Sequence, residues 1–172
     1  THKNVNFAWL PANHLAHLYL TWGKLEKGRE YVERAEAIAR RAPKSLAVAY
    51  AHYNRAIYLQ LKGQYKESEK EYDLALSSVA RINGNTHPYY AVTLIEQSEL
   101  FREESRYAEA EKCLNQALAI HQASYEAEHP ETAAIKVRLA RVLSEEGKYT
   151  EAKELVQQAL KVEESVFGKE DN

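Results

Sequence analysis

The sequence contains one cysteine, Cys113, so no disulfide bond can form within the chain. A lone thiol suits a reducing compartment, and we expect a cytoplasmic protein, although export of a longer parent protein is compatible with the same composition. Methionine is absent altogether, even at position 1, which favours a processed or excised piece of a longer protein.

Other absences exclude whole classes of partner. The net charge is −2, from 23 basic and 25 acidic residues, whereas nucleic-acid-binding proteins usually carry a basic excess that releases counterions from phosphates. No apolar run approaches the roughly 20 residues needed to span a bilayer, and the N-terminus lacks the charged-then-apolar pattern of a secretory signal. We therefore expect neither a nucleic-acid partner nor a membrane partner.

Four copies of one helix-forming pattern make up most of the chain. Glycine and proline are scarce, at 6 and 4 residues, and abundant Ala, Leu, Glu and Lys favour helix along nearly the whole length. The copies begin at Gly23, Gly63, Ser105 and Gly147, so they are 40, 42 and 42 residues apart. A period in this range is typical of stacked repeats that each contact their neighbours, and it predicts an all-α array of four units.

Each unit has the pattern of two helices joined by a tight turn. Apolar residues recur at helical spacing before each copy, and glycine at its first position tolerates the left-handed backbone that closes a helix. The pattern predicts eight helices, with the second helices at about 25–40, 65–81, 107–125 and 149–166, in repeats at about 8–43, 44–86, 87–128 and 129–172 of a single domain, 1–172.

Two histidines stand at equivalent places between units. His87 and His129 are 42 residues apart, and each precedes a proline at which a helix can begin without losing a hydrogen bond. They could be ligands of a bound group, but their repeated position favours a structural role at the start of a helix.

Small residues recur where paired helices must come within about 8–10 Å of each other. They form three columns: Ala16, Ala56, Ser98 and Ala140; Gly28, Ser68, Ala110 and Ala152; and Ala35, Ala75, Ala117 and Ala159. Three tyrosines that follow the turns, Tyr65, Tyr107 and Tyr149, are expected to pack across each pair with the hydroxyl at the rim.

These columns resemble the tetratricopeptide repeat (TPR), and the resemblance covers nearly the whole chain. The 42-residue period, with His-Pro opening the last two units, resembles the longer variety found in kinesin light chains. The first unit departs from the pattern, because Gly28 replaces the usual alanine and Glu36 stands where an apolar residue is expected. The resemblance implies a right-handed superhelix whose first helices line a concave groove that binds peptides and performs no chemistry.

Under that architecture, side chains between the core columns of the first helices form a predicted peptide-binding groove. Its members are Asn13, His14, His17, Tyr50, Tyr53, Asn54, Ile57, Ile95, Glu96, Glu99, Arg138 and Arg141, flanked by Leu10, Val92, Ala134 and Val137. Asn54 matches a column in which many such repeats carry an asparagine that bonds peptide backbone; otherwise it is a solvated amide. The carboxylate clamp of chaperone-binding relatives is missing, so capture of a C-terminal carboxylate is not expected.

Two acidic residues of this groove are expected to face two basic ones on the next unit. Glu96 and Glu99 could simply neutralise Arg138 and Arg141, and exposed pairs of this kind contribute only about 0–1 kcal/mol. Alternatively, the four side chains discriminate between charged residues of a ligand. The sequence leaves both readings open.

Little in the sequence points to catalysis or to a bound metal. His14 and His17 are neighbours on one helix and could bind a transition metal together with His52, but no cysteine or nearby carboxylate completes the set. Cys113 lies at a core column and is interpreted as a buried structural thiol. There is no glycine-rich phosphate loop, Gly-x-Ser-x-Gly turn or Cys-x-x-Cys pair. We expect no enzyme and no cofactor.

The leading hypothesis is therefore a protein–protein interaction scaffold that binds a protein or peptide ligand in the groove. The alternative is structural self-association. An apolar side of the last repeat, around Val142, Val156 and Val162, would then meet a neighbour and form a homo-oligomer.

Overall fold

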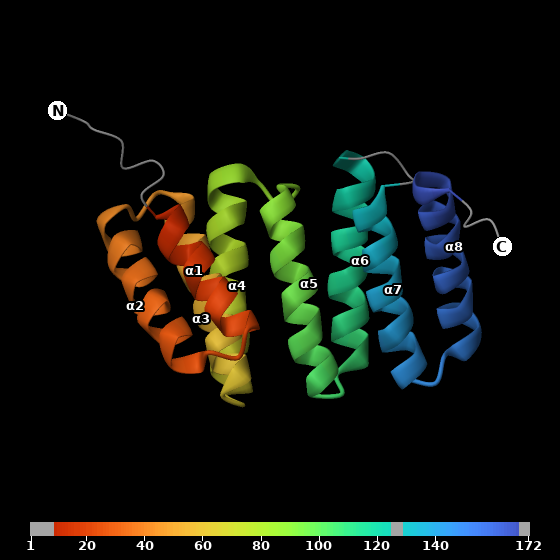
Figure 1. Cartoon of the computed structure of the whole chain (residues 1–172), viewed down its shortest axis with the longest axis horizontal. Helices are drawn as coiled ribbons and strands as arrows, with labels where there is room; N and C mark the ends of the chain where they lie inside the picture. The colour runs from red at the N-terminus through yellow and green to blue at the C-terminus, as the bar shows by residue number, and fades with distance from the viewer. Residues whose placement is uncertain (1–8, 125–128, 169–172) are drawn as a thin grey trace. The chain divides into compact units, whose positions relative to one another are not determined.

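Eight α-helices make up the described part of the chain, which comprises residues 9–124 and 129–168 of a computed structural model (Figure 1). They form four pairs: α1 (Leu10–Thr21) with α2 (Leu25–Arg41), α3 (Leu46–Leu61) with α4 (Tyr65–Asn83), α5 (Pro88–Glu103) with α6 (Tyr107–Ser124), and α7 (Pro130–Glu145) with α8 (Tyr149–Phe167). The prediction of paired helices is confirmed. Positions 8, 125–128 and 169–172 of the expected ranges lie outside the described residues.

The helices group into two units, Thr1–His87 and Pro88–Asn172, each of two repeats. In the first unit, α2 packs against α1 and α3, while α3 packs against α4 and also touches α1. In the second unit, α6 packs against α5 and α7, and α7 packs against α8. Within each unit, the second helix of one pair therefore joins that pair to the next.

The turn inside each pair closes through one backbone arrangement. Gly23, Gly63 and Gly147 all have a left-handed backbone, with φ values of 68°, 71° and 92°. In the first of these turns, Lys24 N donates to Tyr19 O at 2.8 Å, five residues back. This bond defines the Schellman motif, which satisfies carbonyls that a helix end would otherwise leave unpaired.

The small-residue columns lie buried inside the pairs, as predicted. Their alanines and serines are between 0% and 6% exposed. A Cβ on Gly28 would lie 2.4 Å from Leu20 Cδ2, which explains why the first repeat has glycine where the others have alanine or serine. The hydroxyls of Ser68 and Ser98 donate to the backbone carbonyls of Ala56 and Ile95 at 2.8 and 2.6 Å, so burial leaves neither unsatisfied.

Two structural interpretations are confirmed at the level of single side chains. His129 is the N-terminal cap of α7, because its Nδ1 accepts a hydrogen bond from Glu131 N at 3.2 Å. The equivalent helix α5 begins at Pro88, directly after His87. Cys113 is a buried thiol whose Sγ donates weakly to Gln97 Oε1 at 3.8 Å.

Two expectations about the last pair are wrong. Tyr149 does not pack across the pair but is 70% exposed, whereas the equivalent Tyr65 and Tyr107 are half-buried. The expected apolar side around Val142, Val156 and Val162 is not a surface either. Val142 and Val162 are buried in the core of the pair, and Val156 stays exposed.

The turn at Ser105 gives a direct test of the repeat's backbone. Ser105 has φ 59°, and Arg106 N donates to Phe101 O at 2.8 Å, as in the glycine turns. A side chain in the left-handed region costs about 1–2 kcal/mol, partly offset by the greater freedom of unfolded glycine. We expect Ser105→Gly to raise the free energy of unfolding by about 0.5–1 kcal/mol, and Gly63→Ala to lower it similarly. Urea denaturation followed by circular dichroism measures both, and unchanged midpoints would contradict the expectation.

Candidate functional site

The predicted groove residues of the first unit come from α1 and α3, and we call them the α1–α3 face: Asn13, His14, His17, Tyr50, Tyr53, Asn54 and Ile57. The structure brings them together, because α1 packs against α3. It also buries four of them, namely Asn13, Tyr53, Asn54 and Ile57. Among the seven, only His14 is well exposed.

The two asparagines of this face bond each other. Asn54 Nδ2 donates to Asn13 Oδ1 at 2.9 Å and to Asn13 O at 3.2 Å, and Asn13 Nδ2 donates to Trp9 O at 2.9 Å. Each residue is 1% exposed. The expectation that these amides face an open groove is wrong, because close packing of α1 on α3 turns them toward one another.

Aromatic rings close the rest of the α1–α3 face. The ring of Tyr53 lies 5.9 Å from His17 and meets Tyr72 edge-on at 6.4 Å, while Trp9 lies 4.7 Å from Tyr50. Burial lowers the pKa of His17, and the neighbouring His14 acts in the same direction. Burial also raises the pKa of Tyr50. These shifts reflect a face that is largely sealed from water.

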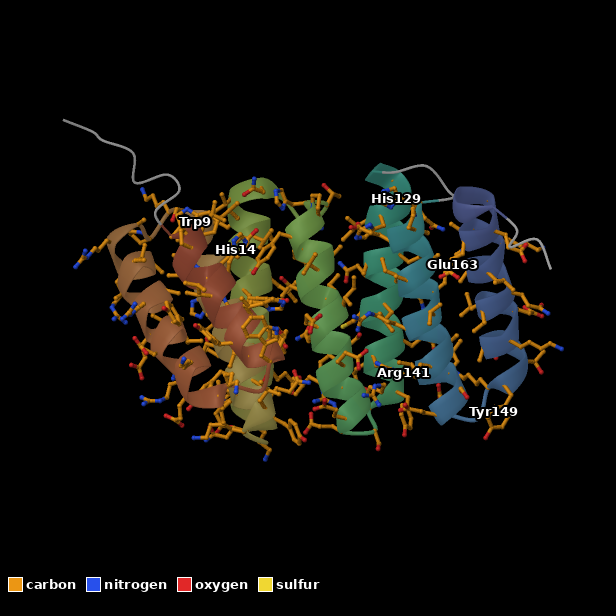
Figure 2. The ribbon with its side chains drawn as sticks, viewed as in Figure 1. Trp9, His14, His129, Arg141, Tyr149 and Glu163 are labelled. Carbon is orange, nitrogen blue, oxygen red and sulfur yellow. The ribbon has the colours of Figure 1, made fainter. Side chains whose placement is uncertain are left out.

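The second unit contributes a different surface, which we call the α5–α7 face: Val92, Ile95, Glu96, Glu99, Ala134, Val137, Arg138 and Arg141. Glu99 is its electrostatic centre. Glu99 Oε1 accepts from Arg138 Nη1 at 3.1 Å and from Arg141 Nη2, and Oε2 accepts from Arg102 Nε at 2.9 Å. Figure 2 shows Arg141 toward the C-terminal end of α7. The prediction that Glu99 faces the two arginines is confirmed.

Of those arginines, Arg138 acts on Glu96 through its charge and not through a hydrogen bond. Glu96 is half-buried and has no hydrogen bond or ion pair among the described residues. Burial raises the pKa of its carboxyl above the ordinary value; nearby Arg138 opposes this shift and Glu99 adds to it. Of the two interpretations that the sequence left open, mutual neutralisation through hydrogen-bonded ion pairs therefore applies to Glu99, to which the guanidinium groups are directed.

A hollow of about 240 Å³ opens beside Glu96 in the α5–α7 face. Its walls are Val92, Ile95, Glu96, His121, Glu131, Ala134, Ile135 and Arg138. His121 Nδ1 lies 3.5 Å from Glu131 Oε2. Burial lowers the pKa of His121; Glu131 opposes this effect and His129 reinforces it. Sequence reasoning did not include His121 or Glu131, which lie on a second helix and at a helix start.

A second hollow, of about 400 Å³, lies among α2, α3 and α4 and was not predicted. Arg55 crosses it, with Nη1 2.7 Å from Glu36 Oε1 and Nε 3.2 Å from Glu71 Oε1. His52 Nδ1 lies 2.6 Å from Glu71 Oε2, so this histidine is engaged there and not with His14. Glu36 at an apolar column was the signal in the sequence that could have revealed this polar cluster.

No set of three His, Cys, Asp or Glu side chains in residues 9–124 and 129–168 is arranged to hold a metal ion. Across the same residues, none of the helices is both long enough and apolar enough to cross a membrane.

Sequence models of the tetratricopeptide repeat match residues 12–41, 48–122 and 97–165. The chain belongs to the tetratricopeptide repeat family. TPR domains are generally protein–protein interaction modules and are typically non-catalytic. No curated protein matches the sequence closely enough to count as a relative.

Solved structures share the TPR fold of this chain. BtubC (BKLC) from P. vanneervenii matches with a TM-score of 0.82 and 23% identity over 100% of this chain and 70% of its own. A Podosopora anserina protein of nearly identical TPR-like repeats, described as a kinesin light chain, matches with a TM-score of 0.78 and 22% identity. The match covers 95% of this chain and 78% of that protein. Pseudomonas aeruginosa pilF matches with a TM-score of 0.71 and 25% identity over 93% of this chain and 63% of its own. The chain is thus structurally similar to kinesin-light-chain-like TPR proteins.

The buried amide pair in the α1–α3 face leads to a test of its role in folding. Asn54→Ala leaves Asn13 Oδ1 buried without a donor, which costs about 1–3 kcal/mol of unfolding free energy. The matched control is Asn115→Ala, at an exposed position on α6, where alanine should be neutral or slightly stabilising. Thermal denaturation measures both. A loss at Asn54 no larger than at Asn115 would show that the amide pair contributes nothing.

The unpaired carboxyl of Glu96 predicts a pH-dependent effect. Its pKa is raised in the folded state, so the folded state binds the proton more tightly than the unfolded state, and stability falls as the pH rises through this range. We expect Glu96→Gln to raise the melting temperature at neutral pH and the gain to vanish in acid. Glu163→Gln, exposed on α8 (Figure 2), is the control. If Glu96→Gln raises the melting temperature equally at neutral and at acidic pH, this account is contradicted.

Proposed function

We propose that this TPR chain is an interaction scaffold that binds a protein or peptide segment on the α5–α7 face. The observation that supports the proposal best is the hollow in that face, where apolar walls and charged side chains lie together and open to solvent. Ligand sites in proteins combine these features, with apolar surface for affinity and a few polar groups for orientation.

The exposed apolar residues of this face support the same function. Val92 and Val137 are both large exposed hydrophobic side chains, one on each of the two first helices. Ala134, which lines the hollow together with Val92, is exposed as well. The α1–α3 face offers less, because its amides and most of its rings bond and stack inside the unit. We therefore shift the expected contact surface toward α5 and α7.

A negative charge introduced into the α5–α7 face tests the proposal. A phage-displayed random peptide library selects ligands for the wild-type chain, and fluorescence anisotropy then measures their affinity. Val137→Asp should weaken binding of the selected peptides at least about tenfold, because a buried unpaired carboxylate costs more than 1.4 kcal/mol. The matched control is Leu74→Asp on the second helix α4, since Leu74 and Val137 are 46% and 45% exposed. If Leu74→Asp weakens binding and Val137→Asp does not, the peptide binds elsewhere than on the first helices.

A second candidate function is self-association through α8. Tyr149, Val156 and Leu160 are exposed and lie along one side of this helix by their spacing. The residues that occupy the place of Val156 in the first and third repeats, Val32 and Leu114, are buried on helices with a further helix packed against them. The exposed stripe is therefore a surface that the same fold covers elsewhere.

Sedimentation velocity over a concentration series tests self-association. If the stripe is a contact between copies, the wild-type chain should dimerise with rising concentration, and Leu160→Glu should keep it monomeric. Leu61→Glu on α3 is a matched control, because Leu61 and Leu160 are 53% and 50% exposed. A wild-type chain that stays monomeric throughout excludes this function.

A further inference from the structure

We propose that the hollow in the α5–α7 face receives one cationic side chain, a lysine or an arginine, from the bound partner segment, with Glu96 as its counter-ion. This inference rests on the proposed function and specifies the chemistry of the partner at one position. Three features of the hollow carry it: its size and apolar walls, its charge, and the unsatisfied state of Glu96.

The size and walls of the hollow suit one long side chain. Its volume of about 240 Å³ lies below the roughly 300–1,000 Å³ typical of small-molecule sites. Val92, Ile95, Ala134 and Ile135 line it with hydrocarbon, and Glu96 adds a carboxylate. Lysine and arginine match this lining, because each has an aliphatic stem that packs along apolar surface and a charged head that reaches a polar group.

The charge of the lining favours a cation. Glu96 and Glu131 carry two carboxylates, whereas Arg138 already donates to Glu99 at 3.1 Å. Burial lowers the pKa of His121 and so disfavours its charged form. The free charge of the hollow is therefore negative, so an acidic ligand residue would be repelled there and a basic one attracted.

The state of Glu96 differs from that of the residues in equivalent positions. Positions 54, 96 and 138 are 42 residues apart, so Asn54, Glu96 and Arg138 occupy the same place in three repeats. Asn54 donates to Asn13 and Arg138 to Glu99, both within their own unit. Glu96 alone of the three has no such partner. Burial of a carboxylate without a hydrogen-bond partner is costly, and groups with a pKa perturbed by burial are enriched at functional sites.

A binding cycle between protein and peptide variants tests the inference. Peptides selected from the random library by the wild-type chain should share a lysine or arginine at one register. Replacing that residue by norleucine, or Glu96 by Gln, should each weaken binding about tenfold, and the two changes together should weaken it little more than either alone. Glu163→Gln, exposed on α8, is the matched control and should bind like wild type. Circular dichroism confirms that the variants are folded.

A variant that fills the hollow without changing charge provides an independent measure. Ala134→Phe places a ring in its wall and should weaken the basic peptide as much as Glu96→Gln does. Selected peptides that share no basic residue, or that bind Glu96→Gln as tightly as wild type, overturn this inference and leave the proposed function standing. A shared acidic residue overturns it as well. Selection of no peptide by the wild-type chain would overturn both the proposed function and the inference.

Discussion

The close approach of the two helices in each pair is the constraint on which the rest of this structure depends. Alanine, serine and glycine fill the columns where the backbones meet, and at Gly28 even a Cβ would collide with Leu20. Such contact distances follow from the side chains at a helix crossing and not from the helices themselves. The left-handed turn that joins the two helices also recurs in every repeat.

With the backbone held in this way, the chemistry between the helices is free to vary. Arg55 forms an ion pair with Glu71 in the second repeat. At the equivalent places in the third repeat, Cys113 bonds weakly to Gln97, and positions 139 and 155 of the fourth are leucines. One contact thus tolerates ionic, polar and apolar pairs. The repeat therefore fixes the backbone arrangement, while the side chains between the helices differ from one repeat to the next.

The two units use this freedom in opposite ways. In the first, the amides of Asn13 and Asn54 bond each other and the ring of Tyr53 packs near His17, so most of the face of α1 and α3 is buried, with Asn54 Oδ1 and His17 Nδ1 left without a hydrogen bond among the described residues. In the second, the arginines converge on Glu99 and leave Glu96 beside an open hollow. Side chains that bond within a unit are less available to a partner, whereas the carboxylate of Glu96 lines a hollow that opens to solvent.

Periodicity in the sequence was enough to determine the eight helices, their pairing, the turns and the buried columns, because each follows from rules that act within a few residues or repeat every unit. The groove residues were assigned by the same register, but their exposure was not predictable. Three contacts depend on side-chain directions across helices that are far apart in sequence. They are the hydrogen bond from Asn54 to Asn13, the bond of Arg138 to Glu99 and not to Glu96, and the ion pair of Glu36 with Arg55. The tertiary structure alone decided these, because a repeat specifies which face of a helix a residue occupies but not which partner lies within bonding distance of it.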